Sequence, residues 1–193
     1  MSRQNRFILY LIFVLCFSII FSYKNNPQGF ISLSPFHQTA QVSSINQSQA
    51  QIFIPAKQTK FSNCQIHGSY PDPECTPGAY IATATKDDIC APGYAKSVRN
   101  VSESQKKNIY AEYGITHRTA GEYEIDHFIS LELGGSNETS NLFPEAAEPR
   151  PGFHEKDKVE NYLHNQVCSG YITLNEAQRE IATDWYAVYQ RVQ

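Results

Sequence analysis

Residues 124–145, EIDHFISLELGGSNETSNLFPE, form the most informative stretch of this 193-residue chain. Partial alternation of polar and apolar residues predicts a strand over 122–129, and the run GGSN at 134–137 predicts a turn. A short second strand is expected around 141–143, where Pro144 should stop it. The centre of the fold is therefore expected to be two short strands joined by a turn.

Helices are expected on both sides of these strands. Pairs of the capping-box type predict that helices begin after Ser102 and after Thr173, and Gly114 and Gly170 are placed to end helices. An apolar face at helical spacing predicts another helix over 154–167. The last helix carries the apolar stripe Leu174, Ala177, Ile181, Trp185 and Val188. This order of strands and helices predicts a small α+β domain.

Charge divides the chain into two parts. Residues 1–60 carry a net charge of +5 with no acidic residue, whereas residues 61–193 carry −8. The composition, with 41% hydrophobic residues, excludes a fully disordered, collagenous or many-pass membrane protein. The acidic second part opposes tight, non-specific binding of nucleic acid.

The first part of the chain is interpreted as an export segment followed by a tether. Two arginines precede the uncharged apolar run at residues 7–21, which predicts a signal peptide or an uncleaved anchor over 1–22. Residues 23–60 are rich in Gln, Ser and Asn and predict a disordered tether. The folded domain is expected over 61–193, in the periplasm or outside the cell, and only the N-terminal segment is expected to meet a membrane.

Four cysteines follow the export segment. In an exported chain an even number of cysteines favours two disulfides, for which three pairings are possible. We favour Cys64–Cys75, which closes a short loop, and Cys90–Cys168, which links the start of the domain to its end. A structural zinc site is the alternative, but the chain lacks a C-x2-C pair.

Candidate chemical groups occur in a fixed order along the central stretch. Asp126 and His127 are adjacent, Asn141 follows the turn, and His154 lies at the start of a predicted helix. A carboxylate can hold a metal ion while a neutral histidine accepts a proton from water. A second neutral histidine could complete the ligands of the metal.

This order resembles the HNH endonucleases, whose ββα-metal motif reads D-H-I-x-P-L, then G-G, then N-L, then a helix with His. The resemblance to small exported bacterial HNH-type proteins covers about residues 76–190, including KDKVENYLHNQVCSGYITLNEAQREIATDW at 156–185. It implies a disulfide-stabilised domain built around a ββα-metal motif with flanking helices. The implied activity is hydrolysis of phosphodiester bonds in DNA, or in RNA, with no protein partner.

The resemblance also implies a role for each matching residue. His127 would be the general base, and Asp126 and His154 would ligate one divalent metal, with magnesium first and manganese, nickel or zinc as alternatives. Asn141 would hold the loop between the strands and so orient His127. Because the gap before His154 is long and rich in proline, the helix ligand could instead be Asp157 or Glu160.

Two departures bear on this assignment. Ser130 stands where the family has a proline, and alternation along a strand places Asp126 and His127 on opposite faces. Both residues can therefore reach one metal only if the strand ends or distorts at His127.

Candidate substrate contacts lie near the start of the same helix. Arg150, Lys156 and Lys158 could meet phosphates there, although alternation with Glu155 and Asp157 also suits a solvated helix face. His164 is interpreted as a packing residue. Four further basic residues are candidates for further phosphate contacts, but ordinary surface is the favoured interpretation: Lys106, Lys107, His117 and Arg118. The alternative to an enzyme is a non-catalytic HNH-like module that binds a partner in the cell envelope.

Overall fold

The computed structural model describes residues 52–193. The predicted export segment and most of the predicted tether therefore lie outside the described residues. The elements run α2 (Lys86–Ile89), α3 (Tyr94–Val98), α4 (Glu103–Glu112), β1 (Tyr123–His127), η1 (Leu131–Leu133), η2 (Thr139–Asn141), β2 (Leu142–Ala146), α5 (Phe153–Cys168) and α6 (Leu174–Val192). The prediction of a small α+β domain is confirmed.

Strands β1 and β2 form an antiparallel pair in which Asp126 faces Phe143 and His127 faces Leu142. Strand β2 continues through Pro144, which pairs with Ile125, so the prediction that proline ends this strand was wrong. A proline has no amide hydrogen to donate. In a two-stranded sheet each strand has one edge without a partner, and a proline nitrogen that faces this edge costs the sheet no hydrogen bond.

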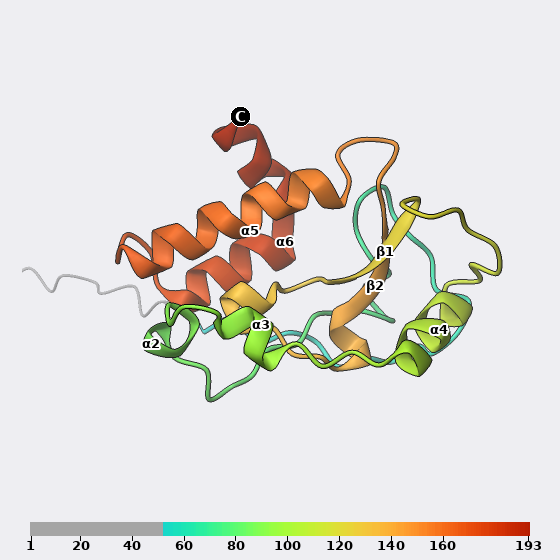
Figure 1. The fold of residues 1–193 in the computed structure, drawn as a ribbon, viewed down its shortest axis with the longest axis horizontal. Coiled ribbons are helices and arrows are strands. Elements are labelled where there is room, and N and C mark those ends of the chain that lie inside the picture. The colour runs from blue at the N-terminus through green and yellow to red at the C-terminus, as the bar shows by residue number, and fades with distance from the viewer. Residues whose placement is uncertain (1–51) are drawn as a thin grey trace, which may run out of the picture. The chain divides into compact units, whose positions relative to one another are not determined.

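The helix predictions are confirmed. Ser102 caps α4 by accepting a hydrogen bond from the Gln105 amide, and Thr173 forms a reciprocal capping box with Glu176 at the start of α6. Figure 1 shows α5 lying along α6, and β1 and β2 lying between this helix pair and α4. Most of the predicted apolar stripe is buried between α5 and α6: Ala177, Ile181, Trp185 and Val188 are each at most 1% exposed.

Both predicted disulfides are confirmed. Cys64 is bonded to Cys75 beside α4 and β2, and Cys90 is bonded to Cys168, 78 residues later. The second bond links the end of α2 to the last residue of α5. Two disulfides are typical of proteins in an oxidising, extracellular-type environment.

The domain begins earlier than the predicted boundary at residue 61. The Phe53 amide donates to Asn175 Oδ1 at 2.8 Å, and the Thr59 amide donates to the Glu74 carbonyl oxygen at 2.9 Å. Residues 53–60, predicted as the end of the tether, are therefore held against the domain. Within residues 52–193 no helix has the length and apolarity needed to cross a membrane.

Candidate functional site

Asn141 holds the loop between the two strands in a single conformation. Its side chain is fully buried, and Oδ1 accepts hydrogen bonds from the amides of Ile129 (2.9 Å) and Ala79 (3.1 Å). Nδ2 donates to the carbonyl oxygens of Ile129 and Ser136, each at 2.9 Å. Four bonds to backbone atoms satisfy the amide and place the end of β1 next to the start of β2.

The two glycines of the turn are required by this conformation. Gly134 has φ +74° and ends η1, a backbone conformation that residues with a side chain rarely adopt. A Cβ atom on Gly135 would lie 1.8 Å from the Ile129 carbonyl oxygen. Gly135 therefore lies against Ile129, the residue whose amide and carbonyl groups Asn141 binds.

His127 is the last residue of β1 and is only 2% exposed. Its Nε2 lies 3.1 Å from Asn137 Oδ1, and the Asn137 amide is oriented by bonds to the Val98 carbonyl (2.8 Å) and the Asn100 amide (3.1 Å). Because Oδ1 can only accept, Nε2 carries the hydrogen, and the lone pair of the neutral ring lies on Nδ1. Burial lowers the pKa of His127 below its usual value, so the ring is neutral at pH 7.

Lys156 joins β1 to α5 through a buried ion cluster. Its side chain is 0% exposed, and Nζ donates to Asp126 Oδ2 at 2.5 Å, to the His127 main-chain oxygen at 2.8 Å and to Glu160 Oε1. Burial opposes ionisation of both partners in the Lys156–Asp126 pair. The attraction between the two charges outweighs this effect of burial. The pKa of Lys156 therefore lies well above its usual value, and the pKa of Asp126 lies below its usual value.

The cluster holds more carboxylates than one ammonium can neutralise. Glu145 Oε2 lies 3.9 Å from Lys156 Nζ, and both Glu145 carboxylate oxygens are buried with no hydrogen-bond partner among the described residues. Burial and the charge of Asp126 raise the pKa of Glu145 well above its usual value, against the opposing charge of Lys156. Burial also raises the pKa of Glu160 to about 7.

A groove of about 600 Å³ opens beside this cluster. Five carboxylates line it. Glu103 is paired with Lys106, and we call the other four the acidic floor: Glu124, Asp126, Asp157 and Glu160. Partial burial and the charges of Asp126 and Asp157 raise the pKa of Glu124 to about 7, and burial and Asp126 raise the pKa of Asp157. The floor therefore holds carboxyl groups that lie close together, and Glu124 and Glu160 take up protons near neutral pH.

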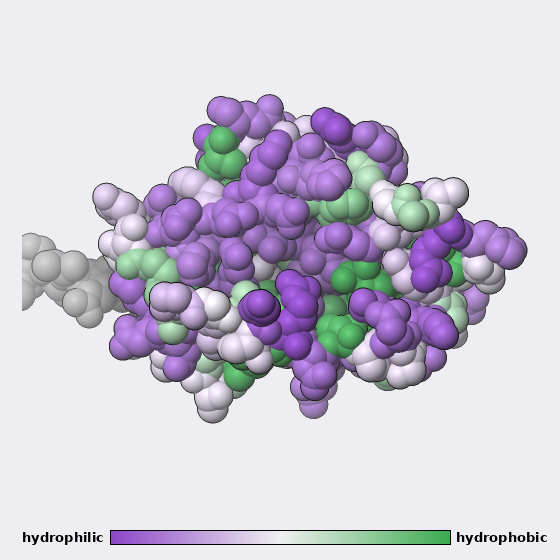
Figure 2. All heavy atoms as spheres, in the orientation of Figure 1, coloured by the Kyte–Doolittle hydropathy of each residue, from purple (hydrophilic) through white to green (hydrophobic). Residues whose placement is uncertain are grey.

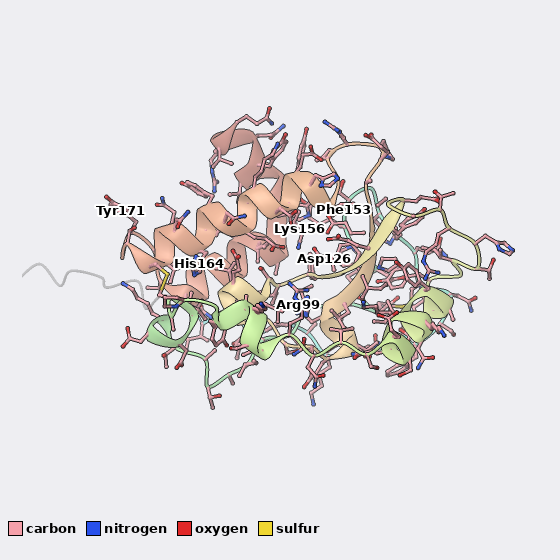
Figure 3. All side chains as sticks on the ribbon, viewed as in Figure 1. Arg99, Asp126, Phe153, Lys156, His164 and Tyr171 are labelled. Carbon is pink, nitrogen blue, oxygen red and sulfur yellow. A yellow bond between two sulfur atoms is a disulfide. The ribbon has the colours of Figure 1, made fainter. Side chains whose placement is uncertain are left out.

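Basic side chains line the same groove, and we call them the cationic wall: Arg99, Lys106, Lys107 and Arg118. The last three were predicted to be ordinary surface, and Arg99 was not singled out. Figure 3 shows Arg99, Asp126 and Lys156 close together between α3 and α5. Figure 2 shows this face as mainly hydrophilic, with an apolar area over the strands. The sequence offered no signal for Arg99, because its place depends on how α3 packs against η1.

The residues predicted around the start of α5 do not gather at the groove. His154 is exposed, packs its ring 4.3 Å from that of Phe153 and does not line the groove. Arg150 is paired with Glu148 at 3.1 Å, and Lys158 lies over the Tyr189 ring at 5.7 Å. The prediction that Lys156 contacts phosphate is corrected, because its ammonium is buried among carboxylates.

One group of side chains has the spacing of a metal site within residues 52–193: Cys90, His164 and Cys168. The two sulfur atoms are bonded to each other, so neither is a thiolate that could bind a metal. His164 Nε2 lies 3.0 Å from the Ile89 carbonyl oxygen and 3.5 Å from Cys168 Sγ. In the disulfide-bonded protein these contacts agree with a packing role for His164.

Comparisons with known proteins add no relative to this description. No family model, no curated protein and no solved structure matches the chain.

Proposed function

We propose that this protein is an exported, metal-dependent endonuclease of the HNH type that hydrolyses phosphodiester bonds in nucleic acid. One observation carries the proposal: an antiparallel strand pair followed by a helix, the order of a ββα-metal motif, places Asp126 and the helix carboxylates Asp157 and Glu160 at one groove, with the buried His127 as the next residue of β1. The loop that joins the strands is held by Asn141, as the family resemblance implies.

The residues at the groove fit a hard divalent cation. Asp126 and Asp157 line the groove, the Asp157 carboxylate makes no ion pair among residues 52–193, and Glu145 is buried beside Lys156. Oxygen donors of this kind suit magnesium or manganese, and magnesium often uses one or two carboxylates with water. We assign Asp126 and Asp157 as ligands, in place of His154. A bound cation would stabilise the negative charge that develops on the phosphate.

His127 serves as the general base in this proposal. Asn137 holds Nε2–H, so the lone pair of the ring lies on Nδ1. Nδ1 is therefore the atom that accepts a proton from the attacking water. The ring is almost fully covered, so the proposal requires a local opening before water reaches Nδ1. Lys156 keeps Asp126 ionised and fixes its position relative to α5.

Export is supported by two independent features. The apolar run at residues 7–21 follows two arginines, and the domain carries two disulfides. A protein secreted into an oxidising compartment combines these properties.

The test uses the full chain purified with its disulfides formed. It should nick plasmid DNA in magnesium or manganese, and His127→Ala should lower the rate by about 10²–10⁴-fold, the usual contribution of a general base. His117→Ala is the matched control, because His117 is exposed and does not line the groove. Equal inactivity of the wild type and His127→Ala with several metals, on DNA and RNA, would show that the proposal is wrong.

The second candidate function is a non-catalytic binding module, and Lys156 is the observation that favours it. Its ammonium already occupies the position between Asp126 and Glu160 that a cation would take. Manganese titration followed by calorimetry separates the two functions. Binding that is lost in Asp126→Ala supports the nuclease, whereas absence of binding in the wild type supports the module.

A further inference from the structure

The cationic wall contains charges that the protein itself does not neutralise. Lys106 is paired with Glu103 at 2.8 Å, but Arg99, Lys107 and Arg118 make no ion pair within 4.0 Å among the described residues. The Arg118 guanidinium lies 3.7 Å above the Tyr110 ring, and both residues line the groove.

The cationic wall and the acidic floor line the same groove but form no ion pairs with each other. In residues 52–193 no ion pair connects a wall residue to Glu124, Asp126, Asp157 or Glu160. Arg99 lines the groove together with Asp126, and Figure 3 shows the two residues near each other beside the proposed reaction centre. Lys107 belongs to α4, and Arg118 to the segment before β1.

We propose that the cationic wall binds the phosphates of a nucleic-acid strand, with Arg99 at the scissile phosphate and Lys107 and Arg118 at flanking phosphates. This inference rests on the proposed nuclease function and names the surface that holds its substrate. Arginine offers several donors that match phosphate oxygens, and lysine offers a point charge. Residues 61–193 carry a net charge of −8, so the rest of the domain repels a phosphate chain and the cationic wall attracts it.

A cationic peptide is the competing occupant of the groove. The acidic floor would attract it, but three unpaired cations would repel it from the opposite side. A nucleic-acid strand accompanied by a divalent cation satisfies both sides, because phosphates meet the wall and the cation meets the floor.

The test measures binding without cleavage. A fluorescein-labelled single-stranded oligonucleotide is titrated with the full chain in calcium, and anisotropy is read over a range of salt concentrations. Arg99→Ala, Lys107→Ala and Arg118→Ala should each weaken binding by about 5–10-fold and reduce the slope of log K against log salt by about 0.7. Arg99→Lys should recover part of the loss, because it keeps the charge.

Lys96→Ala and Arg150→Ala are the matched controls, since both residues are basic and neither lines the groove. Thermal melting of each variant separates weaker binding from unfolding. Equal affinity for the wild type, the wall variants and the controls overturns the inference, and so does tighter binding of a labelled oligolysine. Loss of binding in the wall variants of a protein that never cleaves would overturn the nuclease function alone. Unchanged binding in a protein that cleaves would overturn the wall alone.

Discussion

Two buried polar groups contact the same strand pair and are built on different principles. The Asn141 amide is neutral, and all four of its bonds end on backbone atoms. The Lys156 cluster is charged, and it combines one ammonium with three carboxylates, of which Glu145 keeps two buried oxygens without a hydrogen bond. One group is fully satisfied and the other is not.

The difference separates a structural element from a candidate site. A fully hydrogen-bonded neutral group stabilises one conformation and has no remaining capacity to bind a ligand. A cluster with excess negative charge is destabilised unless a proton or cation compensates it, and perturbed ionisation of this kind is common at functional sites. Substitutions in the two groups should therefore differ in size, in sign and in their dependence on pH.

Removing the neutral group should have the largest effect on stability. Asn141→Ala leaves buried amides and carbonyls of the loop without partners, and we expect the free energy of unfolding to fall by about 4 kcal/mol. The loss should be the same at pH 5 and pH 8, because no charge is involved. Urea unfolding followed by circular dichroism measures it. Asn161→Ala, at an exposed position, should change stability by less than about 0.5 kcal/mol.

Removing the cation should cost slightly less at neutral pH. Lys156→Met leaves Asp126 and Glu160 without their counter-charge, and we expect a loss of about 3 kcal/mol at pH 7. Without Lys156 the folded-state pKa values of these carboxylates rise, so protonation at acidic pH relieves the repulsion. The difference from the wild type should therefore shrink as pH falls towards 4.

Unfolding measured across this pH range tests the prediction, with Lys158→Met as the exposed control. If the loss in the free energy of unfolding were the same at every pH, Lys156 would stabilise the fold independently of charge, as Asn141 does.

Neutralising the unsatisfied carboxylate should have the smallest effect and the opposite sign. The pKa of Glu145 is raised in the folded state, so folding takes up a proton above the usual pKa of 4.5 and stability declines as pH rises. Glu145→Gln removes this decline. We expect a gain of about 1 kcal/mol at pH 7, within the range seen when buried charges are replaced, and no gain at pH 3.

Thermal melting at the two pH values would detect the gain, and Glu148→Gln, an exposed carboxylate, should show none. A lower melting temperature for Glu145→Gln at pH 7 would mean that Glu145 is ionised and stabilising in the folded protein.

Much of the fold could be predicted because local features determine it. The caps at Ser102 and Thr173 act through atoms three residues away, and the buried stripe of α6 follows from helical periodicity. The disulfide pairing was also predicted, from loop positions within an exported domain. The end of β2 was not, because the tolerance of Pro144 depends on the hydrogen-bonding direction within the sheet.

The sequence by itself determined α4, α5 and α6, the strand pair and the order of Asp126, His127 and Asn141 along the chain. Only the tertiary structure decided that Lys156, predicted to contact phosphate or to lie on a solvated helix face, is buried against Asp126, 30 residues earlier in the chain. It also decided that Arg99 faces the groove while His154 does not line it. The physical reason is that the partners of a buried charge depend on how elements far apart in the sequence pack together. Neither residue spacing nor the local charge pattern encodes this packing.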